Sequence, residues 1–264
     1  MSANGRHLGT LDRLYVLDGG AAIAPDRSVY TPGKWCGEPV TLSCNAYLMR
    51  RNGEWVLWDT GIDEALAEEP RGRIIAHGIR GIVARPITAQ LADIGLAAAD
   101  IGMVLLSHAH FDHIGNAGLF ERATWYIQRR EHEAMFGADY RQHGYTPALY
   151  EGLGQAKVEL IDGDLDLFGD DSVRVISTPG HTPGHCSLLV RLANTGPVLL
   201  SGDVAHDAYN MAHRQVPTMN ASRELSLASM ERIAAIVDAE GAQLWLNHDT
   251  AQSATLAHAP AYFD

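Results

Sequence analysis

The chain has few cysteines and no long apolar run. Its 264 residues include only Cys36, Cys44 and Cys186, which form no CxxC pair and are odd in number. That pattern does not fit a disulfide scaffold and favours a reducing compartment. No stretch approaches the roughly 18 apolar residues that span a bilayer. Residues 1–10 are polar and lack the apolar core of a secretory signal. We therefore expect a cytoplasmic protein without membrane contact.

Basic residues are also scarce. Twenty Lys and Arg stand against 32 Asp and Glu, which gives a formal net charge of −12. Nucleic acids and anionic membranes both attract clustered cations, so both are disfavoured as partners. A small neutral or weakly polar substrate fits this charge better. The chain has no linker and no low-complexity tract, and its length suits one domain over residues 1–264.

The motif of a serine hydrolase is missing. Ser201-Gly202-Asp203 lacks the GxSxG elbow, and no serine triad is apparent. Histidine, in contrast, is abundant, with 13 residues. Because histidine is a common metal ligand that titrates near neutral pH, the functional interpretation depends on where these residues lie.

Three imidazoles and a carboxylate lie within six residues, directly after a strand expected at residues 103–107: His108, His110, Asp112 and His113. His108 and His110 face the same way only if the chain stays extended, because strand residues alternate between faces. Asp112 and His113 must then turn back. Zinc binds neutral imidazole and carboxylate oxygen at about 2.0–2.2 Å. Core packing does not account for three titratable rings in so short a segment. The segment therefore predicts a metal site with further ligands downstream.

Three later segments supply such ligands, each at the end of an expected strand. The loop TPGHTPGH contains His181 and His185, and either can be the ligand. Asp203 and His248 end the other two segments. Because loops at strand ends can converge, the four segments are expected to meet at one point. Isolated histidines are interpreted as solvated or satisfied residues; these are His77, His132, His143 and His258.

Strand signals are clearest in the first quarter of the chain. Asn52-Gly53 between apolar runs predicts a hairpin of strands at 41–49 and 55–58. A strand at 14–17 is expected to end at a turn over residues 18–20, which read Asp-Gly-Gly. Strand pairs joined by tight turns dominate, so a doubly wound parallel sheet is disfavoured.

Two further segments stand out. Residues 61–86 show no clear period and are expected to form a long excursion that can cover a site. The clearest helix begins at an N-cap, Asn220 or Ser222, and ends at Gly241.

The order HxHxDH, then GH, Asp and His resembles the metallo-β-lactamase superfamily, over residues 14–264. The superfamily also has an early aspartate before Thr-Gly, which Asp59-Thr60-Gly61 matches. Within it, the length, the SHxHFDH run, the TPGHTPGH loop and the C-terminal HD tail most resemble the N-acyl-homoserine lactonases. The resemblance implies an α/β fold, an αβ/βα sandwich of two mixed β-sheets flanked by helices, with metals at one edge.

The resemblance also implies two divalent metal ions and assigns their ligands. The first ion takes His108, His110 and His185, the second takes Asp112, His113 and His248, and Asp203 bridges both. His185 is preferred to His181 because the second histidine of the loop is taken as the family's ligand. Asp59 is expected to hold a ligand imidazole by a hydrogen bond. Zinc is the favoured metal, with iron, manganese and cobalt as alternatives.

The implied reaction opens the lactone ring of N-acyl-homoserine lactones, which quenches quorum sensing. Two divalent ions about 3.5–4 Å apart share a bridging hydroxide as nucleophile, and Asp112 passes a proton to the leaving alkoxide. The better-known lactonases carry a tyrosine three residues after the bridging aspartate, where this chain has His206. His206, or Tyr209 three residues further on, is the candidate donor to the oxyanion. Phe111 is a candidate for the acyl-chain wall.

The expected partner is a small-molecule lactone, with no nucleic acid or membrane, and a homodimer is left open. The same metal frame also serves other lactones or esters, and glyoxalase-II-like thioesterases. The thioesterases carry a basic C-terminal region, whereas the last 20 residues here contain no Lys or Arg. An iron-dependent redox member of the superfamily is a further alternative, which metal analysis and an absorption spectrum would separate from a colourless zinc hydrolase.

Overall fold

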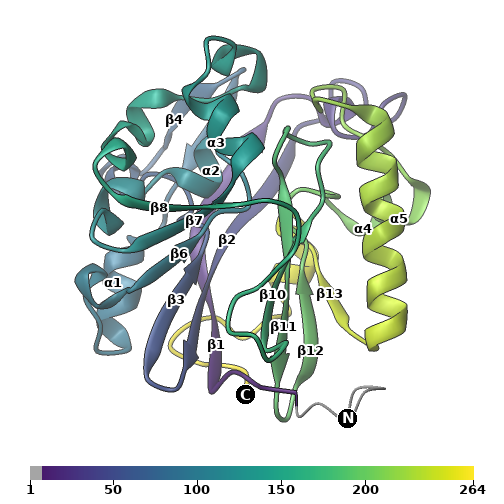
Figure 1. Cartoon of the computed structure of the whole chain (residues 1–264). Coiled ribbons are helices and arrows are strands. Elements are labelled where there is room, and N and C mark those ends of the chain that lie inside the picture. Colours follow the sequence, from purple (N-terminus) through teal and green to yellow (C-terminus); the bar gives the residue numbers. More distant parts are fainter. Residues whose placement is uncertain (1–7) are drawn as a thin grey trace.

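Two β-sheets pack face to face, and helices cover their outer faces (Figure 1). The computed structural model describes residues 8–264. Across the larger sheet the strands are, in order, β4 (Arg73–Ala76), β5 (Ile79–Ile82), β1 (Arg13–Ala24), β2 (Val40–Arg51), β3 (Glu54–Trp58), β6 (Met103–Leu105), β7 (Thr124–Gln128) and β8 (Lys157–Ile161). Across the smaller sheet they are β13 (Gln243–Trp245), β12 (Gly196–Leu200), β11 (Cys186–Leu192), β10 (Val173–Ser177) and β9 (Leu165–Asp166).

Both sheets are mixed, as expected. From β3 through β6 and β7 to β8 the neighbours are parallel, whereas β4, β5, β1, β2 and β3 pair antiparallel. In the smaller sheet only β12 and β13 are parallel. The expected αβ/βα sandwich is therefore confirmed.

The α-helices are α1 (Ile87–Asp93), α2 (Phe111–Ile114), α3 (Arg129–Phe136), α4 (Ala208–His213), α5 (Arg223–Glu240) and α6 (Thr250–Ser253). Short 3-10 helices connect them at Arg27–Val29, Glu64–Glu68, Ala98–Asp100, Ala117–Phe120, Tyr140–His143, Pro147–Leu149 and Glu151–Gly154. In Figure 1, α1 and α3 lie outside the larger sheet and α5 lies outside the smaller one. Within residues 8–264, no helix combines the length and apolarity that crossing a membrane requires.

Alternation along the strands builds the layers. In β1, Leu14 and Val16 point into the core between the sheets, whereas Tyr15 and Leu17 pack under the outer helices. In β11, Leu188 faces the same inner core, whereas Leu189 points to the other face and packs against α5. Strands covered on both faces read as continuous apolar runs, as these do.

Two local predictions are confirmed. Asn52 and Gly53 have φ of 50° and 86°, the positive values that a tight hairpin turn of this kind needs, and they join β2 to β3. Helix α5 begins after Ser222, whose side chain accepts the N–H of Leu225, and it ends at Gly241 with φ of 62°. Ser222, rather than Asn220, is thus the N-cap.

Two others are wrong. Strand β1 does not end at residues 18–20 but continues to Ala24 through a β-bulge, where the register shifts. Glycine is required there because a Cβ on Gly19 would lie 2.1 Å from the carbonyl oxygen of Cys44. Residues 61–86 are not an irregular excursion throughout, since β4 and β5 form a hairpin that pairs with β1. The adjacent glycines at residues 19 and 20 fit a β-bulge as well as a turn, so the sequence alone did not distinguish these two structures.

Candidate metal centre

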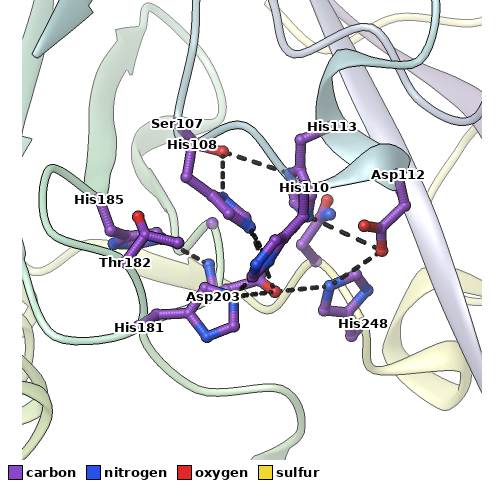
Figure 2. A network of polar contacts seen from close by, with 12 residues as sticks. Ser107, His108, His110, Asp112, His113, His181, Thr182, His185, Asp203 and His248 are labelled. Carbon is purple, nitrogen blue, oxygen red and sulfur yellow. Dashed lines mark hydrogen bonds and ion pairs between the residues drawn. The ribbon is translucent and has the colours of Figure 1, made fainter. Parts of the chain in front are cut away.

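The candidate ligands gather where strands of both sheets end (Figure 2). The run 108–113 follows β6 of the larger sheet, and the TPGHTPGH loop follows β10 of the smaller one. Asp203 and His248 follow β12 and β13. Strand β6 ends two residues earlier than predicted, at Leu105, and β13 ends at Trp245. The residues that follow each strand form the loops that carry the histidines.

Helix α2 turns the first run back on itself. His110 is its N-cap, and the N–H of His113 donates to the His110 carbonyl at 3.0 Å. This single turn places the ring of His113 4.0 Å from that of His108, centroid to centroid. The Nε2 atom of His108 lies 3.0 Å from Nδ1 of His110. The short helix thus supplies the reversal that the spacing required.

Asp203 lies at the centre of the cluster. Its Oδ2 atom is 2.9 Å from Nε2 of His248 and 3.3 Å from Nε2 of His181. Its Oδ1 atom is 3.1 Å from Nε2 of His113. The Oδ2 atom of Asp112 lies 3.6 Å from Nε2 of His248. One carboxylate therefore faces two sets of imidazoles, which is the arrangement of a bridging ligand.

The donor atoms fit divalent cations. In the part of the chain that the structure describes, three overlapping groups have donor atoms within 4.8 Å of one another: His108, His110, His181 and Asp203; His113, Asp203 and His248; and Cys44, Asp112 and His248. The buried atoms of the described residues that form no hydrogen bond include His113 Nε2 and Asp203 Oδ1. An unpaired buried polar atom is costly. A cation held by imidazole nitrogen and carboxylate oxygen satisfies both.

The TPGHTPGH loop directs His181, not His185, into the cluster. His181 Nε2 lies 2.9 Å from Nδ1 of His110. Both ring nitrogens of His185 are engaged elsewhere: Nδ1 donates to a carbonyl of its own loop at 2.9 Å, and Nε2 accepts the backbone N–H of Asp203 at 2.7 Å. His185 directly precedes β11, and its ring lies against Gly202, just after the end of β12. The geometry reverses the sequence-based preference for His185.

Hydrogen bonds fix the orientation of the cluster's rings. Nδ1 of His248 donates to a backbone carbonyl of β2 at 2.7 Å, and Nε2 of His110 donates to the carbonyl of His143 at 2.8 Å. Nδ1 of His181 lies 2.9 Å from the side-chain oxygen of Asn220. Each ring is left with one nitrogen directed at the cluster, as protein metal sites require.

Asp59 lies where its expected role requires. Its carboxylate accepts the backbone N–H of Ser107 and the Ser107 hydroxyl, each at 2.7 Å, and lies 2.8 Å from Nδ1 of His113. Its φ of 58° is in the left-handed region, which is costly for a residue with a side chain. The strained turn after β3 thus orients the ring of His113.

Burial and neighbouring charges shift the pKa values of the cluster residues in opposite directions. Burial by itself lowers the pKa of His248, but the Asp203 carboxylate outweighs burial and raises the pKa to about 9. Burial likewise raises the pKa of Asp203, yet His248 and His113 hold that pKa well below its ordinary value. For His108 and His181, burial prevails and lowers the pKa, which favours the neutral imidazole that binds metal. Because a metal ion and a proton compete for the same ring nitrogen, metal binding at this site depends on pH.

Glu131 is a buried carboxylate next to the ligand loops that the sequence did not reveal. It is completely buried on α3 and accepts four hydrogen bonds. The N–H of Ala109 and the hydroxyl of Tyr145 donate to Oε1, at 2.9 and 2.6 Å. The hydroxyl of Thr182 and the N–H of Gly184 donate to Oε2, at 2.7 and 2.9 Å. One carboxylate thereby ties the loop of His108 and His110 to the loop of His181.

We expect Glu131→Ala to weaken metal binding about 10–100-fold, the usual effect of removing a group that orients ligands. Four buried donors lose their acceptor, so the free energy of unfolding should fall by about 3 kcal/mol. Metal titration and urea unfolding measure the two effects. Glu133→Ala, an exposed carboxylate on the same helix, is the control and should change neither. Metal affinity unchanged in Glu131→Ala would show that the two loops hold their geometry without it.

A cavity of about 350 Å³ opens onto the cluster. Its floor contains His110, Asp112, Asp203, His206 and His248. Its walls are largely apolar and include Ala22, Ala24, Val29, Leu42, Ala76, Ile79 and Met219. Strand β1, strand β2 and the β4–β5 hairpin thus build the walls, so residues 61–86 do cover the site.

The structure separates the three remaining candidates. Phe111 and His206 both line the cavity. Tyr209 does not: its ring packs against Trp35 and His213, with centroid distances of 4.9 and 4.1 Å. Tyr209 lies in the first turn of α4 with its ring outside the cavity, so the structure does not bring it to the site, contrary to the expectation from the sequence.

Comparison with known proteins gives concordant results. The family model of the metallo-beta-lactamase superfamily matches residues 39–236. An N-acyl homoserine lactonase of Bacillus sp. is 30% identical over 263 residues, which cover 96% of this chain and 99% of that protein. The N-acyl homoserine lactonase AttM of Azorhizobium caulinodans is 33% identical over 181 residues, 67% of this chain and 68% of that one.

A solved structure resembles the fold closely. It is a structure of N-acyl homoserine lactone hydrolase with the product N-hexanoyl-L-homoserine bound at the catalytic metal center. The TM-score is 0.84 and the sequence identity 27%, and the match covers 97% of this chain and 100% of that one.

Proposed function

The chain belongs to the metallo-beta-lactamase superfamily and, within it, to the N-acyl homoserine lactonases, and on that premise we propose that it opens the lactone ring of N-acyl homoserine lactones by metal-dependent hydrolysis. The observation that carries this proposal is the position of Asp203. It lies between two sets of imidazoles at the floor of a cavity with apolar walls.

We assign the metal ligands by this geometry. His108, His110 and His181 would hold one cation, Asp112, His113 and His248 the other, and Asp203 both. Imidazole and carboxylate donors suit zinc, so zinc is our proposal for the metal. The three cysteines are unpaired, which supports a reducing, cytoplasmic location.

The protein's own groups complete the chemistry. Divalent cations bound here would supply a water of lowered pKa, about 7, and would polarise the ester carbonyl. Asp112 lines the cavity, which supports the proposal that it carries a proton to the alkoxide that leaves when the ring opens. Ala76 and Ile79 of the β4–β5 hairpin and Phe111 of α2 offer the acyl chain an apolar wall.

A pH-stat assay on a panel of homoserine lactones of different chain length tests this function. A thioester and a phosphodiester are measured beside them on the same metal-loaded protein. We expect the lactones to be hydrolysed with the highest kcat/KM. A thioester hydrolysed faster than every lactone would instead support a glyoxalase-II-like enzyme.

A further inference from the structure

Tyr30 brings a phenol to the cavity from an unexpected part of the chain. It follows the 3-10 helix Arg27–Val29 and is only 5% exposed. Its side chain lines the cavity with Asp112, Asp203 and His206. Burial, and then the carboxylates of Asp112 and Asp203, raise the pKa of Tyr30, so the phenol stays protonated. The ring of Tyr30 packs against that of His206, which itself stacks on His248, so the phenol lies on the side of the cavity that holds the cluster.

The Tyr30 hydroxyl is free to donate. Within residues 8–264, no group accepts a hydrogen bond from it. The other nearby phenols are committed or distant. The hydroxyl of Tyr145 donates to Glu131 at 2.6 Å, and the ring of Tyr209 packs on Trp35 outside the cavity.

The segment that carries Tyr30 is fastened to α4. Arg27 forms an ion pair with Asp207 at 3.0 Å. Asn210 on α4 donates from its side-chain amide to the Tyr30 carbonyl at 3.3 Å and to the Thr31 hydroxyl at 2.9 Å. These contacts hold the phenol in place before a substrate arrives, and preorganised donors stabilise developing charge most effectively.

His206 packs against Tyr30 and lies close to Asp203. Its ring lies between Tyr30, at 4.8 Å, and His248, at 5.1 Å, centroid to centroid. A neutral imidazole has a single N–H, so only one ring nitrogen of His206 can donate at a time. Its Nε2 atom lies 3.5 Å from the Asp203 carboxylate, whereas Nδ1 is buried without a partner. The ring nitrogen of His206 that lies nearest the cluster thus faces the Asp203 carboxylate.

We propose that Tyr30 is a catalytic residue that donates a hydrogen bond to the carbonyl oxygen of the lactone, an inference that rests on the proposed hydrolysis. Water gives a proton to Asp112, and the resulting hydroxide adds to the carbonyl carbon, which turns the carbonyl oxygen into an oxyanion. The Tyr30 O–H stabilises that oxyanion and keeps its own proton. The ring C–O bond then breaks, and the alkoxide takes the proton from Asp112.

Tyr30→Phe tests the proposal, because it removes the hydroxyl and keeps the ring. We expect kcat to fall on the order of 100-fold, as for other oxyanion donors, with KM within about threefold. Metal content and melting temperature should stay unchanged. Calorimetry should show weaker binding of the ring-opened product N-hexanoyl-homoserine, whose carboxylate accepts the same hydrogen bond. Tyr209→Phe is the matched control and should keep the activity and product affinity of the wild type.

Each other outcome overturns the proposal. A kcat of Tyr30→Phe within twofold of the wild type would show that the hydroxyl is not used. If kcat of Tyr30→Phe per bound metal equalled that of the wild type, Tyr30 would only stabilise metal binding and would not be a catalytic residue. A loss in His206→Ala without one in Tyr30→Phe would assign the donor to His206. A wild-type protein that opens no lactone would overturn the proposed function itself.

Discussion

Replacing Asp203 with alanine is expected to remove bound metal and hydrolytic activity together. Asp203 faces His181 and His248 with one oxygen and His113 with the other, so its loss leaves both sets of imidazoles without a shared anion. A water of ordinary pKa then has to act as the nucleophile, and kcat/KM should fall more than about 10⁴-fold. Elemental analysis and the lactone assay on one preparation measure both effects.

The control for this change is Asp238→Ala, which removes an exposed carboxylate of α5 far along the helix. It should keep metal content and activity. If Asp203→Ala kept full activity with one metal bound, the scheme with two cations would be wrong.

The second large effect is expected from His181 and not from His185. In His181→Ala the cluster loses a ring nitrogen that lies 3.3 Å from Asp203 Oδ2, and kcat/KM should fall about 10²–10³-fold with partial loss of metal. In His185→Ala two buried hydrogen bonds are lost, so the free energy of unfolding should fall by about 2 kcal/mol while metal is retained.

The two variants control each other, because they make the same change in the same loop. Metal content per folded protein, measured at a temperature where both are folded, decides between them. Metal lost from His185→Ala and kept in His181→Ala would restore the assignment that the sequence favoured.

The sequence predicts the architecture well wherever one local rule applies. Asn52-Gly53 and Ser222 specify a turn and a helix start through their own backbone geometry. The sequence-based prediction fails where two different structures have the same local sequence pattern. Glycines at residues 19 and 20 read as a turn, but the neighbouring strand at Cys44 makes them a bulge, and that contact is invisible in the local sequence.

The site shows the same limit. The run from His108 to His113 is informative because its ligands are adjacent, and the structure closes it with one helical turn. The choice between His181 and His185 depends on which ring the loop turns inward, which only the contact with Asp203 reveals.

Two further residues escape the sequence for a related reason. Glu131 looks like a surface carboxylate of a short helix, and only its four donors show that it is buried. Tyr30 lies more than 70 residues from the first histidine of the cluster, in a segment without a motif. Its place in the cavity follows from the fastening of that segment to α4.

Two cations that share Asp203 are the claim on which the rest depends. Anomalous diffraction from crystals soaked in zinc, recorded above and below the zinc absorption edge, tests it directly. We expect two peaks in contact with Asp203, one among His108, His110 and His181 and the other among Asp112, His113 and His248. A map with no peak at this edge of the sheets, or with a peak beside His185 instead, would contradict it.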